Sequence, residues 1–188
     1  MLFRSSLVRR WSDAGYLPNL KRLREAGSET TLTKDKSMDG GVWLSVATGL
    51  PAEEHGLYSF FQWDAGRMRI ARPSQDDLYL SPFWLSLQTK GIRTLVFDVP
   101  HSFRPVAQAG IEIVGYGAHD RLAGPSSWPR NLISELTRKF GPYPYREDGT
   151  GQRLPDDIRR LHDRLLDGLQ RKVEAAHHLL VTQPWDFA

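Results

Sequence analysis

The fold is indicated by residues 81–99, SPFWLSLQTKGIRTLVFDV, where a short helical pattern leads into an apolar run. Ser81 is a favourable helix cap and Pro82 suits the first helical position, so we expect a helix over Ser81–Lys90. Ile92–Val99 is apolar almost throughout, as is typical of a strand buried on both faces of a sheet. A helix that leads into a doubly buried strand favours an α/β fold.

The same alternation of helical and strand-like segments continues outward from this stretch. Apolar residues at steps of three and four predict further helices over Pro18–Ala26, Trp128–Phe140 and about Asp156–Val181. Short β-prone runs predict strands over Glu29–Thr33 and Ile111–Val114, and the entry to another at Pro184–Ala188. Leu57–Ile70 has the pattern of a hairpin that turns at 64–66. We therefore expect a three-layer α/β/α sandwich with a largely parallel sheet.

The composition of the 188-residue chain is that of an ordinary globular protein, with 40% hydrophobic and 25% charged residues. No apolar run approaches the length of a transmembrane helix. The absence of cysteine excludes disulfides, cysteine-ligated zinc and thiol nucleophiles, and it favours a cytoplasmic location. Any metal ion must therefore be held by Asp, Glu, His or a hydroxyl oxygen.

The net charge is only slightly basic, at +3, and the arginines are spread along the chain. A basic chain suits phosphate-bearing ligands. With no basic run and no RNA-binding motif, however, a dedicated nucleic-acid-binding module is not favoured. Residues 1–12 are basic and contain no acid before Asp13, so we expect a solvated lead-in there and a single domain over 13–188.

A polar, glycine-rich turn at residues 37–41, SMDGG, precedes an apolar segment. We expect this turn to lead into a buried helix, since Ser37 and Asp39 are both good helix caps. The first backbone N–H groups of such a helix, together with its positive dipole end, suit an anion such as phosphate. Gly40 and Gly41 are therefore candidate substrate-binding residues.

Two segments together carry a family resemblance: LPNLKRLREAG at residues 17–27 and WLSVATGLPAEEHG at residues 43–56. Their order and spacing resemble the type I phosphodiesterase/nucleotide pyrophosphatase family of the alkaline phosphatase superfamily. The resemblance extends from about Asp13 to the end of the chain, which implies that 13–188 form part of an alkaline-phosphatase-like catalytic domain. It also implies hydrolysis of phosphate diesters or pyrophosphates with two divalent metal ions, usually zinc. A Thr or Ser at a helix start is the nucleophile that the resemblance implies.

The chain departs from the family pattern at the position of the nucleophile. That position lies nine residues before Thr48 and holds Asp39. A carboxylate there would repel a phosphate unless a metal ion or a proton neutralises it. Ser37 supplies a hydroxyl under a shifted alignment. Three interpretations stay open: Asp39 as metal ligand or nucleophile, Ser37 as nucleophile, or a degenerate site.

Other metal ligands of the family also lack a counterpart. The first, an Asp before the LPNL helix, would fall within residues 1–12, and the later ones would lie beyond Ala188. The resemblance thus implies an N-terminal portion of the domain, truncated at both ends and inactive as an isolated chain. We expect a metal-dependent hydrolase of phosphodiester or nucleotide pyrophosphate bonds, present as an incomplete half. The alternative is a non-catalytic remnant or interaction module with an anion-binding surface.

Histidines and aromatic residues supply the remaining candidates. His55, inside the second motif, is expected to tie down its loop through a ring nitrogen rather than to bind a metal ion. His101 and His119 follow predicted strands, where α/β folds bind ligands, so they are candidate substrate-binding residues; the alternative is surface-loop residues. The aromatic run at 58–63 is interpreted as core in preference to a base-stacking platform.

The expected partner is a phosphate-ester small molecule or a nucleotide. The apolar stripe of the last helix and an uncovered sheet edge also predict self-association of the isolated chain. A sulfatase or phosphomutase relative is less favoured, because sulfatases usually need a Cys or Ser in a distinctive motif and the chain contains no Cys.

Overall fold

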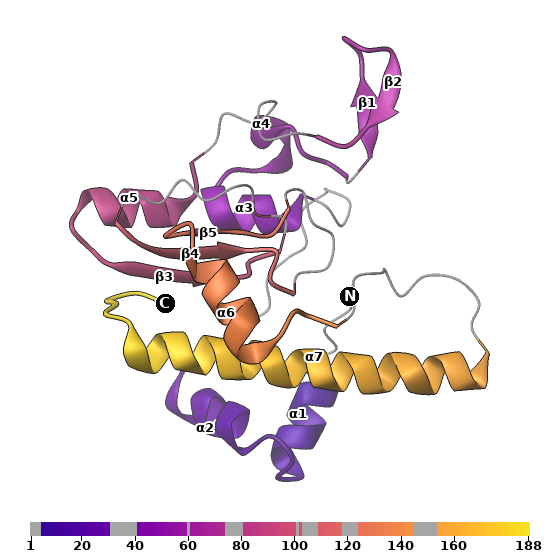
Figure 1. The fold of residues 1–188 in the computed structure, drawn as a ribbon, viewed down its shortest axis with the longest axis vertical. Helices are drawn as coiled ribbons and strands as arrows, with labels where there is room; N and C mark the ends of the chain where they lie inside the picture. Colours follow the sequence, from indigo (N-terminus) through magenta and orange to yellow (C-terminus); the bar gives the residue numbers. More distant parts are fainter. Residues whose placement is uncertain are drawn as a thin grey trace. The chain divides into compact units, whose positions relative to one another are not determined.

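The computed structural model describes residues 5–30, 41–59, 61–73, 81–100, 102, 109–117, 124–144 and 154–188 (Figure 1). The chain divides into two compact units, Met1–Lys34 and Asp35–Ala188. The described part of the first unit is helical, and that of the second combines a mixed sheet with helices. The α/β class predicted from the sequence is therefore confirmed.

The first unit pairs helix α1 (Ser5–Asp13) with helix α2 (Pro18–Ala26). The connection between them uses Gly15 at a φ of 84°, a left-handed conformation that favours glycine. The helix predicted over Pro18–Ala26 is confirmed. Helix α1 occupies most of the segment expected to be a solvated lead-in. The local sequence pattern does not predict α1, because a short helix depends on contacts from elsewhere in the chain.

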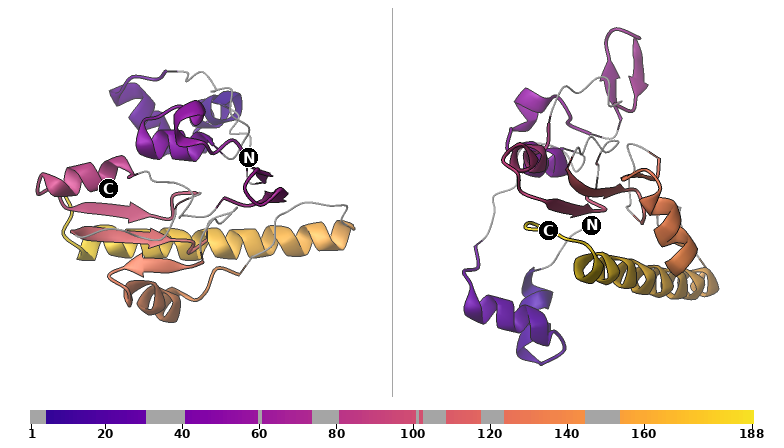
Figure 2. Two further views of the ribbon diagram at one scale, coloured as in Figure 1. Left: turned by 90° about the horizontal axis from the view of Figure 1, so that it is seen from above. Right: turned by 60° about the vertical axis from the view of Figure 1, so that its left-hand side comes forward.

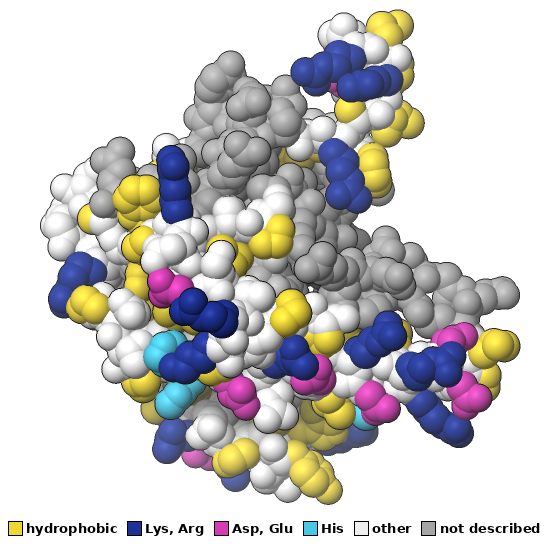
Figure 3. All heavy atoms as spheres, in the orientation of Figure 1, with side chains coloured by type: hydrophobic (Ala, Val, Ile, Leu, Met, Phe, Trp, Pro, Cys, Tyr) yellow, Lys and Arg dark blue, Asp and Glu magenta, His cyan; other side chains and the backbone are white. Residues whose placement is uncertain are grey.

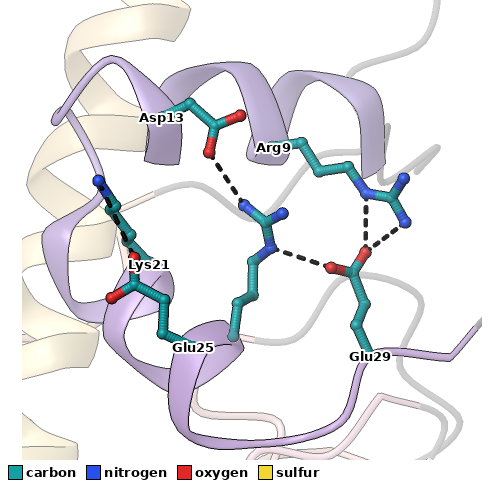
Figure 4. Close-up of polar contacts among 6 residues, drawn as sticks. Arg9, Asp13, Lys21, Glu25 and Glu29 are labelled. Atoms are coloured by element: carbon teal, nitrogen blue, oxygen red, sulfur yellow. Dashed lines mark hydrogen bonds and ion pairs between the residues drawn. The ribbon is translucent and has the colours of Figure 1, made fainter.

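Glu29 joins the two helices through its carboxylate (Figure 4). Arg9 of α1 donates to its Oε1 at 2.6 and 2.8 Å, and Arg24 of α2 donates to its Oε2 at 2.9 Å. Arg24 also lies 3.5 Å from the carboxylate of Asp13 at the end of α1. The Asp13 carboxylate thus contacts an arginine of α2, and the Glu29 carboxylate contacts one arginine of each helix.

The second unit is built on strands β3 (Thr94–Phe97), β4 (Gly110–Val114) and β5 (Ser126–Trp128). β3 and β4 are parallel, whereas β5 runs antiparallel to β4, so the sheet of the described residues is mixed. Gly110 begins β4 at a φ of 120°. A side chain there would collide with the backbone of Thr94 on β3, so the close approach of the two strands requires glycine.

The C-terminal segment lies along the other edge of β3. Phe187 forms a parallel bridge with Thr94, and its carbonyl oxygen accepts a hydrogen bond of 2.8 Å from the Leu95 N–H. Just before it, the Asp186 carboxylate accepts hydrogen bonds of 2.7 to 2.9 Å from the backbone and the guanidinium of Arg93. The prediction of a strand entry at Pro184–Ala188 agrees with the bridge at Phe187, but no strand forms there and all five residues are exposed.

Helices of the second unit pack near this sheet: α3 (Val42–Thr48), α5 (Phe83–Thr89), α6 (Leu132–Phe140) and α7 (Pro155–Thr182). Leu95 of β3 packs in one apolar cluster with Leu136 of α6 and Leu179 of α7. The next residue, Val96, packs in a second cluster with Trp84 of α5. Successive strand residues point to opposite faces, so helices contact both faces of β3 (Figure 1 and Figure 2). The doubly buried strand predicted within Ile92–Val99 is confirmed.

Some predicted boundaries shift for local reasons. Helix α5 begins at Phe83 because Pro82 keeps an extended ψ of 151°. Helix α6 begins at Leu132, and the first residue of the predicted helix instead ends β5. Ser127 of β5 connects the two elements, since its hydroxyl accepts a 2.9 Å hydrogen bond from the Ile133 N–H. Glu29 and Thr30, the described part of the predicted strand 29–33, are not in a strand.

Helix α7 contains a buried glycine at its centre, Gly168. A Cβ at Gly168 would lie 2.6 Å from the Tyr143 ring, and a Cβ at Gly117, after β4, would meet the same ring at 2.6 Å. The ring therefore fits only because both neighbours lack a side chain. In the described part of the chain, no helix has the length and apolar character needed to cross a membrane.

Strands β1 (Gln62–Asp64) and β2 (Arg69–Ala71) form a separate antiparallel hairpin, which confirms the prediction for Leu57–Ile70. The Asp64 carboxylate accepts a 3.0 Å hydrogen bond from the Arg67 N–H and shapes the turn. The core interpretation of the aromatic run is wrong for its described members. Exposed aromatic side chains in this region are those of Tyr58, Phe61 and Trp63; Phe60 lies outside the described residues.

Candidate functional site

The segment of the second motif folds into two short helices joined by a tight turn. Helix α3 ends at Thr48, and helix α4 (Ala52–His55) follows after the extended Pro51. Gly49 and Gly56 end the two helices, and both have a φ of 73°. Residues with a side chain are strained in this left-handed conformation, so the two turns account for both motif glycines.

His55 locks α4 against α3. Its ring is buried, with only 3% of the residue exposed. The Leu57 N–H donates to Nδ1 at 3.1 Å, so Nδ1 acts as the acceptor and the ring proton is assigned to Nε2. Nε2 then donates to the Ser45 hydroxyl oxygen at 2.9 Å. Both ring nitrogens are used within the fold, whereas a metal ligand must offer a lone pair. The structural role predicted for His55 is confirmed.

Most of the other predicted site residues lie outside the described residues: Ser37, Asp39, Gly40, His101 and His119. Gly41 is described and directly precedes α3. It is buried, and its carbonyl oxygen accepts a 3.0 Å hydrogen bond from the Ser45 N–H, the first bond of the helix. The prediction of a helix after Gly41 is confirmed, but the helix is not buried all round. Leu44 and Ala47 are buried, whereas Trp43 and Val46 are exposed.

Asp98 stands at the carboxyl end of β3 with a fully buried side chain. Its Oδ2 accepts hydrogen bonds from Lys172 Nζ of α7 at 2.7 Å and from the Gly117 N–H at 2.9 Å. Its backbone has a φ of 55°, an uncommon value for a residue with a side chain. Oδ1 makes no hydrogen bond to any residue that the structure describes. This end of the sheet therefore carries a buried carboxylate that is neutralised from α7.

The sequence pattern placed Asp98 within the predicted strand Ile92–Val99 but did not identify Lys172 as its partner. The signal was present in the spacing of α7, because Lys172 lies four residues after buried Gly168 and three before buried Ala175. A lysine on the buried side of a helix needs an anionic partner. The partner itself lies 74 positions earlier in the chain, so the pairing follows only from the fold.

Two tyrosines surround this ion pair. Burial raises the pKa of Tyr116 and of Tyr143, and the negative charge of Asp98 adds to the increase in both. Arg171 acts in the opposite direction on Tyr116. The Tyr116 hydroxyl donates a 3.0 Å hydrogen bond to the Gly141 carbonyl oxygen. Both phenols are therefore protonated at neutral pH, and Tyr116 acts as a hydrogen-bond donor rather than as a base.

A metal site in this protein would need several His, Asp or Glu side chains close together. Across these ranges, no three His, Asp or Glu side chains gather closely enough to hold a metal ion. The described residues therefore do not by themselves form the two-metal centre that the resemblance implies.

Comparison with protein families matches residues 3–187 to type I phosphodiesterase / nucleotide pyrophosphatase. Comparison with curated proteins and with solved structures gave no significant match. The family match includes both quoted motifs, the strand that ends at Asp98, and the C-terminal segment beside β3. Since the match covers nearly the whole chain, the protein belongs to the type I phosphodiesterase / nucleotide pyrophosphatase family.

Proposed function

We propose that this chain takes part in the hydrolysis of phosphodiester or nucleotide pyrophosphate bonds. Membership of the family supports a hydrolase of phosphoester bonds, and the match over residues 3–187 is the observation that carries the proposal. The folded second motif adds support, because His55 and two left-handed glycines fix the segment that follows the expected nucleophile position.

The proposed roles centre on the turn before α3. Asp39 is assigned as nucleophile or metal ligand, with Ser37 as the alternative nucleophile. Gly40 and Gly41 are assigned to the phosphate, and His101 and His119 to the rest of the substrate. The position of Gly41 at the start of α3 supports this arrangement, because a polar turn there would stand at a helix held rigidly by the Ser45–His55 hydrogen bond.

The proposal extends to the complete fold and to metal dependence. A three-layer α/β/α sandwich is favoured by the helices that contact both faces of β3. Family membership favours two divalent metal ions, with zinc as the expected ion. Such ions lower the pKa of a nucleophile and stabilise a leaving oxygen, and Asp39 is the residue of this chain assigned to hold one.

The test combines metal analysis with hydrolysis of a chromogenic phosphodiester, with and without added zinc. In the full-length protein we expect turnover that a chelator abolishes. We also expect loss of that turnover in Asp39→Asn if Asp39 is the nucleophile, or in Ser37→Ala if Ser37 is. Asp163→Asn and Ser86→Ala are matched controls, because both residues are exposed and neither lies on the motif helices α3 and α4. Absence of metal binding and of turnover in every arm would overturn the proposal and leave the non-catalytic, anion-binding module.

A further inference from the structure

The β1–β2 hairpin has one apolar face that points to solvent. Its register places Trp63 directly opposite Ile70, so both side chains lie on the same face. Trp63 is 58% exposed and Ile70 is 70% exposed. Phe61 and Met68, which flank this pair at the two ends of the hairpin, are exposed as well. Four large apolar side chains therefore stand together in water, which is unusual for a surface without a partner.

The opposite face of the hairpin is tied to the rest of the second unit. The Gln62 side chain donates to the Gly56 carbonyl oxygen at 3.0 Å and accepts from the Tyr58 N–H at 3.2 Å. Gln62, Asp64 and Ala71 of this face line an open cleft of about 770 Å³ beside α4, and Trp63 and Arg72 line it as well. Exposure along the strands supports this arrangement, since Gln62, Asp64 and Ala71 of this face are half-buried. The hairpin is thus anchored on one side and presents its apolar side outward.

The hairpin is positively charged, but its arginines do not all lie on the apolar face. Arg69 is opposite Asp64 in the register and so lies on the anchored face. Within residues 61–73 there are three arginines, Arg67, Arg69 and Arg72, and a single acid, Asp64. Arg67 lies 2.8 Å from the Asp64 carboxylate, and Arg72 stacks over the Phe61 ring at 4.9 Å from its centroid. Figure 3 shows this mixture of hydrophobic and basic side chains on the hairpin, at its upper right.

We propose that the exposed face of this hairpin docks on an anionic lipid surface. A tryptophan suits the headgroup level of a bilayer, aliphatic side chains suit the acyl boundary beneath it, and arginines suit the lipid phosphates. The hairpin presents all three kinds of side chain together. This docking is independent of hydrolysis, so its test neither requires nor reports phosphodiesterase activity.

Two other occupants fit the surface less well. A single-stranded nucleic acid stacks its bases on aromatic rings, but Ile70 and Met68 offer no ring, so half of the apolar face would be unused. A second protein copy needs a face of about 800 Å² per partner, and three-residue strands present less than that. A lipid surface needs no such shape complementarity.

The test is sedimentation with phosphatidylcholine vesicles that contain or lack phosphatidylserine, at low and high salt. We expect binding only to the anionic vesicles and release at high salt. Trp63→Ser and Ile70→Ser should each weaken binding roughly tenfold. Arg72→Gln, which removes the cation beside the exposed Phe61 ring, should weaken it about fivefold. Matched controls are Val181→Ser and Arg159→Gln, both exposed on α7, which should bind as wild type.

Thermal unfolding of each variant separates loss of docking from loss of folding, and only variants that unfold with wild-type behaviour are compared. The proposal is overturned by absence of binding to anionic vesicles, or by equal losses in the hairpin and control variants. It is also overturned if Trp63→Ser weakens binding of a single-stranded oligonucleotide but leaves vesicle binding unchanged. A change in self-association on Ile70→Ser, with unchanged vesicle binding, would assign the face to a second copy.

Discussion

Asp98 and Lys172 form an ion pair that connects β3 to α7, in which the carboxylate is fully buried and the lysine side chain is 32% exposed. Replacing Lys172 with Met would leave the Asp98 carboxylate buried without its cation, and removal of one partner of a buried pair typically costs about 3–5 kcal/mol. We therefore expect Lys172→Met to lower the free energy of unfolding by that amount in urea titrations. Lys90→Met, at an exposed site, is the control and should change it by less than about 0.5 kcal/mol.

The double variant Asp98→Asn/Lys172→Met distinguishes charge from packing. Because it removes both charges, it should recover much of the stability lost in Lys172→Met. If Lys172→Met is as stable as Lys90→Met, another group must stabilise the buried charge of the Asp98 carboxylate.

Gly168 and Tyr143 make a second residue-scale prediction. Ala normally stabilises a helix relative to Gly by about 1 kcal/mol, but the new Cβ would lie 2.6 Å from the Tyr143 ring. Gly168→Ala should therefore destabilise the wild type, by about 1–3 kcal/mol. In a Tyr143→Ala background, the same substitution should stabilise by up to about 1 kcal/mol. The change in the free energy of unfolding is measured by urea titration in both backgrounds. If it has the same sign in both, the Tyr143 ring does not pack between the two glycines as described.

At the scale of elements, the α1–α2 pair depends on the ionisation of Glu29. Hydrogen bonds from Arg9 and then from Arg24 hold the pKa of Glu29 below its ordinary value of 4.5. Folding is therefore favoured by this group above pH 4.5, and the contribution is lost as the pH falls through the lowered folded-state pKa. We expect amide protection in α1 to decrease across that acidic range.

The matched variants are Glu29→Gln and Glu25→Gln. Glu29→Gln should reduce α1 protection at neutral pH and remove the acidic transition. Glu25 lies 4.0 Å from Lys21 on the same helix and has no arginine partner from α1 among the described residues, so Glu25→Gln should retain the transition (Figure 4). An unchanged acidic transition in Glu29→Gln would assign the pH dependence to another group.

Helix α7 carries an apolar stripe that the described sheet does not cover. Leu165, Leu169 and Val173 are exposed, while Ala175 and Leu179 are buried against the sheet. Exposed apolar stripes favour association, so the molar mass from light scattering should rise with concentration. Leu169→Ser/Val173→Ser should shift the protein toward the monomer, and the polar control Arg159→Ser/His162→Ser on the same helix should not. A wild type that remains a monodisperse monomer would contradict the prediction.

At the scale of the whole molecule, the elements with local patterns were predictable from the sequence. Pro18–Ala26 has the spacing of an amphipathic helix with proline at its start, and the run around Thr94–Phe97 is apolar enough for burial on both faces. Helix α1 and strand β5 were not predictable in this way. Arg9 of α1 donates to the carboxylate of Glu29, and β5 pairs with β4, so the contacts that hold both elements are distant in sequence.

In the candidate site, too, some residues were predictable from the local sequence and others depend on contacts that are distant in sequence. His55 was predictable as a structural residue, because it lies within a compact motif in which two short helices each end at a glycine. The Asp98–Lys172 pair was not, since the residues lie on different elements and only the packing of α7 on the sheet brings them together. The exposure of Trp63 was also missed, because an alternating aromatic strand has the same sequence pattern whether its face is covered or not.

The bridge between Phe187 and Thr94 also has a consequence for synthesis of the chain. Arg93 emerges from the ribosome 93 residues before Asp186, the residue that binds it beside this bridge. At about 5–20 residues per second, translation leaves that edge of β3 without its partner for roughly five to twenty seconds. During this interval the nascent β3 edge is a template for pairing with other chains, so a chaperone that shields it at the ribosome would raise the yield of folded protein.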